Sequence, residues 1–493
     1  GSTANGKGGG GAGAGSGGDD GGADTPPEGA LLASLSSHSA AINCVRWSFD
    51  GSLLASAGDD GVVLLYECRG GGGAGAGSGG DDGGADTPPE GALLASLSSH
   101  SAAINCVRWS FDGSLLASAG DDGVVLLYEC LRSVGGGGGG GGATPSAFGA
   151  AAGLESWRCR RPLRGHGGDV TDLAWSPDGA RLASASIDNT VLVWAVADGR
   201  RVAVLSGHAG LVKGVAWDPV GRFIASQGDD RSVIVWRTAD WKVERRLAEP
   251  FADAVQHVHS LSFFLRLSWS PCGSQLLTPN AFRRPNHVAP LFGRASGFET
   301  QLDFVGHRAP VCATRFSPRL YVPTGTPPPA LAAPLAGGEG ADAPPAGPAV
   351  NGGGVHAVGR GGGGESGWVD SASYTCLALG SKDKGATVWK ASAATPFISL
   401  AKMFGSDLVD LSWGSDGYTL AACSTDGHVM LLRFEAEELG VVVPRAQEAR
   451  ILSTIARSFG GTAVVAQLPE SITTLVMEDA LWGRNRGKEN PGG

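Results

Sequence analysis

The sequence predicts an all-β fold, a β-propeller of about seven four-stranded blades that carries Gly-, Pro- and Ala-rich segments without fixed structure. Two observations predict it. Residues 165–194 and 207–236 repeat one plan, GHGGDVTDLAWSPDGARLASASIDNTVLVW and GHAGLVKGVAWDPVGRFIASQGDDRSVIVW, with His166 and His208 42 positions apart. That spacing lies within the period of roughly 40 to 45 residues of a four-stranded blade. Within each repeat, short apolar runs alternate with turns that contain Pro, Asp and Gly.

The remaining units follow the same plan less closely. They are residues 265–279, residues 306–318 continued by 374–389 after an insertion, and residues 407–434. Residues 8–68 recur letter for letter as 70–130, and each copy contains HSAAINCVRWSFDGSLLASAGDDGVVLLYEC. Blades of one ring diverge because each packs against different neighbours, so identity on this scale indicates a recent duplication or an assembly error. Both copies are expected to be blade-like, and closure of the ring is left open.

The strands and turns have a local explanation. Runs such as VTDLAW, RLASAS and TVLVW are short, rich in β-branched residues and nearly continuous in apolar character, as expected for strands that are covered on both faces. The turns SPDG, WDPVG, SFDG and SPCG separate them. Radial stacking of such sheets into a ring buries both faces.

Composition divides the chain into segments. A disordered leader is expected over 1–30, the propeller over 31–440, and a tail over 441–493 in which LPESITTLVMEDALWGR is a candidate short amphipathic helix. Within the propeller, low-complexity linkers are expected at 69–92 and 131–152 and a disordered insertion at 322–372.

Charge and cysteine usage exclude several classes of protein. The net charge of −10 argues against direct DNA binding, because such domains carry a clustered basic face. The nine Cys residues form no CxxC pair, which fits reduced thiols in the cytosol or nucleus. No apolar run approaches the roughly 18 residues needed to cross a bilayer, so no membrane partner is expected.

Four polar side chains recur in the repeats and resemble a catalytic set. In one unit they are His208, Ser226, Asp230 and Trp236, which we expect to be hydrogen-bonded in series as a tetrad. The other tetrads, with Tyr as the last member in the identical copies, are His38, Ser56, Asp60 and Tyr66; His100, Ser118, Asp122 and Tyr128; and His166, Ser184, Asp188 and Trp194.

The repetition itself favours a structural role. A catalyst needs one set rather than several, and no GxSxG elbow is present, so the tetrads are interpreted as braces within the blades and not as an enzyme's triad. The segment GSTANGKG lacks the Ser or Thr of a phosphate loop, and His257 and His259 lack further ligands at suitable spacing. No catalytic residue, cofactor or metal site is expected.

Partner binding is expected at the loop edges of the ring. The residues that flank the first apolar position after the His are the candidates, namely Asp169, Thr171, Leu211 and Lys213. The alternative, that they are ordinary solvated loop residues, stays open.

Several stretches together resemble one family. They are INCVRWS with LASAGDD, ESWRC, SASIDNTVLVW, GLVKGVAWDPVGRFIASQGDDRSVIVWRTADW, LRLSWSPCG, DFVGHRAPV, LALGSKDKGATVW and DLSWGSDGYTLAACSTDG. Over residues 36 to 440 the chain resembles the WD-repeat half of the HIRA/Hir histone chaperones, which are WD40 propellers. The resemblance implies a nuclear scaffold for replication-independent deposition of histones H3 and H4, linked to transcriptional repression.

The same resemblance implies the partners. They are the other subunits of the Hir complex and the anti-silencing-function histone chaperone. Histones H3 and H4 are implied as partners too, and whether they bind directly or through these proteins is left open. In the family a short basic segment beyond the propeller binds that chaperone, and no copy of it is recognised here.

Two other functions are weighed against this one. The middle subunit of chromatin assembly factor 1, which serves replication-coupled deposition, looks similar across LASAGDD and SIDNT, but TADW, DFVGH and GSKD favour the Hir side. A WD40 substrate receptor of a ubiquitin ligase is the other alternative, and nothing here resembles an F-box.

Overall fold

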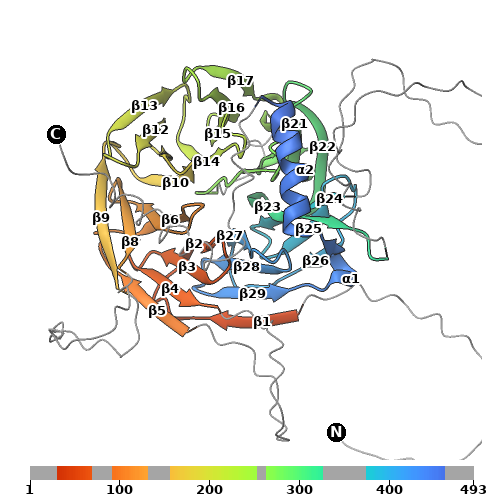
Figure 1. Cartoon of the computed structure of the whole chain (residues 1–493), viewed down its shortest axis with the longest axis horizontal. Helices are drawn as coiled ribbons and strands as arrows, with labels where there is room; N and C mark the ends of the chain where they lie inside the picture. Colours follow the sequence, from red (N-terminus) through yellow and green to blue (C-terminus); the bar gives the residue numbers. More distant parts are fainter. Residues whose placement is uncertain (1–29, 69–91, 132–155, 253–261, 326–372, 461–493) are drawn as a thin grey trace, which may run out of the picture.

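The structure is a computed structural model that describes residues 30–68, 92–131, 156–252, 262–325 and 373–460 (Figure 1). The leader, linkers and insertion for which the sequence predicted no fixed structure lie almost entirely outside these residues. The helix predicted within LPESITTLVMEDALWGR lies outside them as well.

Seven antiparallel sheets stand around a common centre, which confirms the prediction of a seven-bladed propeller (Figure 1). Blade 1 is formed by β2 (Ile42–Trp47), β3 (Leu53–Gly58), β4 (Val63–Glu67) and β5 (Ala92–Leu97). Blade 2 is formed by β6 (Ile104–Trp109), β7 (Leu115–Gly120), β8 (Val124–Cys130) and β9 (Trp157–Arg164). Blade 3 is formed by β10 (Val170–Trp175), β11 (Arg181–Ser186), β12 (Thr190–Ala195) and β13 (Arg201–Ser206). Blade 4 is formed by β14 (Val212–Trp217), β15 (Phe223–Gly228), β16 (Ser232–Arg237) and β17 (Val243–Leu247).

The next two blades each carry one extra strand. Blade 5 is formed by β18 (Ser268–Trp269), β19 (Gln275–Leu277), β21 (Asn286–Gly293) and β22 (Glu299–His307), with β20 (Ala281–Arg283) paired to β21. Blade 6 is formed by β23 (Val311–Val322), β24 (Tyr374–Ser381), β25 (Ala386–Lys390) and β26 (Ile398–Leu400), with β30 (Val441–Val442) paired to β23. Blade 7 is formed by β27 (Leu408–Trp413), β28 (Thr419–Ser424), β29 (Val429–Arg433) and β1 (Ala30–Leu35).

The ring is closed by its first strand. β1 pairs antiparallel with β29, with Leu35 opposite Val429, so blade 7 joins segments from both ends of the propeller. Both identical copies take part: the first supplies β1 to β4 and the second supplies β5 to β8. Because β1 supplies the outer strand of blade 7, β29 is paired on that side and is not left as an open sheet edge.

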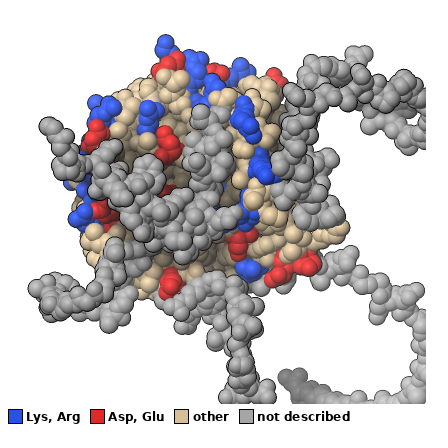
Figure 2. All heavy atoms as spheres, viewed as in Figure 1, with Lys and Arg blue, Asp and Glu red and all other residues tan. Residues whose placement is uncertain are grey.

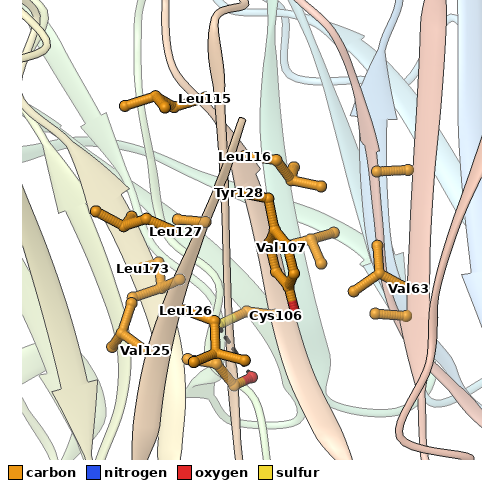
Figure 3. Packing of buried hydrophobic residues seen from close by; sticks show 14 of the residues in the cluster. Val63, Cys106, Val107, Leu115, Leu116, Val125, Leu126, Leu127, Tyr128 and Leu173 are labelled. Atoms are coloured by element: carbon orange, nitrogen blue, oxygen red, sulfur yellow. Dashed lines mark hydrogen bonds between the residues drawn. The ribbon is translucent and has the colours of Figure 1, made fainter. Parts of the chain in front are cut away.

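The apolar runs are buried because each blade is covered by two neighbours. All six residues of β10 are buried, whereas four of the five residues of β17, an outer strand, are exposed. Alternate side chains of one blade reach opposite neighbours, as Figure 3 shows: Leu116 and Tyr128 point towards Val63 of blade 1, and Leu127 lies beside Leu173 of blade 3. Each such aliphatic side chain contributes about 1.5–3 kcal/mol on full burial.

Ion pairs between the innermost strands hold the centre of the ring. Asp410 on β27 accepts a hydrogen bond from Arg46 on β2 at 2.5 Å and one from Arg315 on β23 at 3.3 Å. The fully buried Arg266, just before β18, lies 3.5 Å from Asp410 and 3.1 Å from Asp172 on β10. Buried charges persist only when paired, so this cluster links blades 1, 3, 5, 6 and 7.

Besides the strands, the described residues form three helical segments: η1 (Glu249–Phe251), α1 (Ala436–Leu439) and α2 (Arg445–Ser458). α2, which the sequence analysis did not predict, packs its apolar side on a cluster that contains Cys272, Leu320, Val322, Val443 and Leu452. Its Glu448 accepts hydrogen bonds from Arg319 Nε at 2.8 Å and from the Leu320 amide at 2.6 Å. Among the described residues, no helix is long and apolar enough to span a membrane.

Candidate functional site

In blades 3 and 4 the four polar groups of each tetrad are joined by hydrogen bonds. His166 Nδ1 lies 2.8 Å from Asp188 Oδ2, His166 Nε2 lies 2.7 Å from Ser184 Oγ, and Trp194 Nε1 donates to the same Oγ at 2.8 Å. The corresponding contacts of His208 with Asp230 and Ser226, and of Trp236 with Ser226, are 2.8 to 3.0 Å long. These are the groups that the sequence analysis expected to be bonded in series.

The bonds also define how the protons are arranged. Ser184 Oγ accepts the indole N–H of Trp194, so its own proton is available for His166 Nε2, and Nδ1–H then donates to Asp188. Burial lowers the pKa of His166 and favours this neutral imidazole. Hydrogen bonds outweigh burial at Asp188, and its pKa is lowered, so the carboxylate remains charged.

The tetrads face the interior of the blades. The His side chains of the four predicted tetrads are at most 1% exposed, and Ser184 and Ser226 are fully buried. A serine nucleophile needs open access to a substrate carbonyl, and these hydroxyls are covered and already bonded. The arrangement can brace adjacent strands, and it offers no place for a substrate.

The two identical copies complete only part of the series. His38 contacts Asp60 and Ser56, and His100 contacts Asp122 and Ser118, at 2.6 to 2.8 Å. Tyr128, which takes the position of the closing Trp in blade 2, is buried, and burial raises the pKa of its hydroxyl. Tyr66, at the same position of β4, is buried, and burial raises its pKa.

A fifth set in blade 6 was missed by sequence reasoning. His307 Nδ1 lies 3.0 Å from Asp383, and its Nε2 lies 2.9 Å from Thr387 Oγ1, which accepts the indole N–H of Trp389 at 2.8 Å. In blade 6 the hydroxyl is on the third strand, β25, and Thr387 pairs with Leu379 of β24. In blade 3 the hydroxyl is on the second strand, β11, and Ser184 pairs with Leu192 of β12. A Thr two positions before the closing Trp was the available signal, and the insertion before β24 obscured it.

Two of the four rim candidates are buried, which corrects their expected role. Thr171 Oγ1 donates to the carbonyl of Val212 in blade 4 at 2.8 Å, and Lys213 Nζ donates to the carbonyl of Ser262 at 3.0 Å and pairs with Asp229 at 2.8 Å. Equivalent residues on other innermost strands make the same bonds to the next blade, namely Asn43 to Ile104 and Asn105 to Val170. This position therefore fastens neighbouring blades together.

The other two rim candidates remain accessible. Leu211 is 38% exposed, and Asp169 is partly exposed at the start of β10. Burial, and then the nearby Asp121, raise the pKa of Asp169. These two residues keep the candidate role that the sequence analysis assigned to all four.

Ligand groups for a metal do not gather in the residues that the structure describes, where no cluster of three or more His, Cys, Asp or Glu could hold an ion. Burial raises the pKa of Cys44 to about 11 and that of Cys312 to about 12, which disfavours the thiolate. His257, His259 and the GSTANGKG segment lie outside the described residues.

Comparison with known proteins agrees with this architecture. The family model described as the CAF1B/HIR1 beta-propeller domain matches residues 86–439, and the WD domain, G-beta repeat, matches residues 29–67. Among similar curated proteins, Protein HIRA of Oryza sativa subsp. japonica is 38% identical over 80% of this chain and 37% of its own length. Protein HIRA of Homo sapiens is 36% identical over 78% of this chain and 33% of its own length, so the chain spans about a third of these relatives. The chain therefore belongs to the CAF1B/HIR1 β-propeller family, on the side of the HIRA proteins.

Proposed function

We propose that the chain is the propeller scaffold of a HIRA-like histone chaperone, acting in the nucleus in replication-independent deposition of H3 and H4 and in transcriptional regulation. The observation that carries the proposal is the family match, which extends over most of the ring. Its partners would be the other Hir-complex subunits and the anti-silencing-function chaperone, and through them the histones.

The interior of the blades supports binding over catalysis. The same His and carboxylate pair, bonded to a hydroxyl, recurs in five blades as an internal brace. Their repetition and burial leave the surface of the ring as the working part of the molecule.

The Hir side is preferred to chromatin assembly factor 1. The family model covers both groups, whereas the two relatives reported above, one from a plant and one from an animal, are HIRA proteins. Replication-independent function predicts chromatin association outside S phase, and a chain confined to replication foci would contradict it.

Capture of Hir-complex subunits tests both the function and the rim. We expect wild type to capture them and the double variant Asp169→Lys with Leu211→Asp to lose them, whereas Asp198→Lys, on an exposed turn of blade 3, keeps them. Equal capture by all three proteins would reject a role of Asp169 and Leu211 in partner binding. Failure of wild type to capture any subunit would contradict the scaffold itself.

A further inference from the structure

A groove of about 410 Å³ lies between α2 and the turns that follow the innermost strands of blades 7 and 1. One side is aromatic, with Trp47, Phe49 and Trp413, and the other is formed by α2, with Arg445, Ala449 and Arg450. An apolar surface with a few polar groups at fixed positions is typical of a binding site.

One buried hydrogen-bond donor in this groove has no acceptor. In four other blades the Trp at the end of the innermost strand donates its indole N–H to a carbonyl of the preceding blade, at 3.0 to 3.3 Å. Trp109, for example, donates to the carbonyl of Arg46. Nε1 of Trp47, like Nε1 of Trp217 in blade 4, is buried without a partner, and of these two residues Trp47 lines the groove. A bound group with an acceptor oxygen would remove this penalty of about 1–3 kcal/mol.

The charges of the groove favour an anion. Arg319 and Glu448, which also line it, neutralise each other at 2.8 Å. Arg445 reaches only the carbonyl of Ser415, at 3.5 Å, and in the described part of the chain neither Arg445 nor Arg450 forms an ion pair. Burial, and then repulsion by Arg319, lower the pKa of Arg445, and these effects outweigh the attraction of its charge by Glu448 and Asp50.

The basic character of α2 is local. Figure 2 shows Lys and Arg side chains in a line over this helix, although the whole chain has a net charge of −10. Two carboxylates, Glu448 in the lining and Asp50 next to the lining residue Phe49, offset part of this positive charge, but the three arginines Arg319, Arg445 and Arg450 outnumber them. An acidic ligand would therefore be attracted to this part of the ring in particular.

We propose that the groove binds an acidic segment of a partner protein that carries a large aliphatic or aromatic side chain. That side chain would pack against Trp47 and Phe49, the carboxylates would pair with Arg445 and Arg450, and a carbonyl oxygen would accept the N–H of Trp47. The inference rests on the proposed scaffold function, because it names a surface and a kind of partner for it.

The test is fluorescence anisotropy on the full chain with the labelled probe peptide Glu-Glu-Asp-Trp-Leu-Glu-Glu-Asp. We expect binding that weakens with added salt. The double variant Arg445→Glu with Arg450→Glu should weaken it by about tenfold or more, because it replaces attraction with repulsion. The matched control Arg457→Glu, on the same helix but not among the lining residues, should bind as wild type does.

A second variant separates binding from folding. Trp47→Phe keeps an aromatic ring and removes only the unpaired donor, so binding should fall about fivefold while stability changes little. Trp109→Phe removes an N–H that is already bonded, so it should lower stability and leave peptide binding unchanged.

Three outcomes would overturn the proposal. The first is equal binding of a peptide with Lys in place of every acidic residue. The second is unchanged binding by the double Arg variant. The third is binding that appears only after removal of residues 461–493, which would make the chain's own tail the occupant. Capture of Hir-complex subunits by a groove variant that no longer binds the peptide would keep the scaffold function and place its contacts elsewhere.

Discussion

Replacement of Asp410 by Asn should be among the most destabilising single changes in this chain. The carboxylate is fully buried, and it lies 2.5 Å from Arg46, 3.3 Å from Arg315 and 3.5 Å from Arg266. Asn keeps the shape and removes the charge, which leaves these guanidinium groups without their shared counterion. Breaking a buried pair costs about 3–5 kcal/mol, and Coulomb's law at an effective dielectric of about 20 gives about 4 kcal/mol for charges 4 Å apart.

The assay is urea unfolding followed by tryptophan fluorescence. We expect the free energy of unfolding to fall by about 3–5 kcal/mol, with an unchanged slope against urea. Asp416→Asn is the control, because its pair with Arg433 is exposed and should contribute about 0–1 kcal/mol. A loss at Asp410 no larger than the loss at Asp416 would refute the argument that this cluster holds the first and last blades together.

Three further predictions concern the tetrads. Ser184→Ala should lower the free energy of unfolding by about 1–3 kcal/mol, because it leaves the buried N–H of Trp194 without its acceptor; an unchanged free energy would contradict the brace. Burial lowers the pKa of His166, so the unfolded chain binds a proton more readily than the folded one, and the free energy of unfolding should fall as the pH drops below about 6.5. Urea midpoints measured between about pH 7.5 and 5 would show this dependence on pH, and a His166→Gln variant should lose it. Thr387→Val should destabilise blade 6, and adding Leu379→Ser should recover part of the loss by returning the hydroxyl to the other strand; a purely additive loss would argue against the exchange.

Local patterns predicted the blades well. The 42-residue spacing, the turns and the apolar runs all concern residues within one unit, so the number of blades and the tetrads of blades 3 and 4 follow from the sequence. Where a long insertion breaks the unit, the pattern is lost, although the ladder of β24 and β25 still places Thr387 beside His307.

Contacts between blades could not be predicted in this way. Thr171 and Lys213 are the second residues of β10 and β14 and were expected at an exposed rim. In the structure they are buried, and carbonyl groups beyond their own blade accept their hydrogen bonds. α2 was missed because its apolar side, which contains Leu452, is matched by residues of blades 5 and 6 that no local pattern connects with it.

The sequence by itself determined the repeating unit, since strands, turns and tetrads all depend on residues that lie within one repeat. Only the tertiary structure determined which charged side chains are paired and which are left unpaired. Arg46 and Asp410 are 364 positions apart and meet only because the ring closes, and the unpaired indole of Trp47 and the cations of α2 share a groove for the same reason. Burial and pairing of charge depend on which chain segments become neighbours in space, and that is settled by packing rather than by any local pattern.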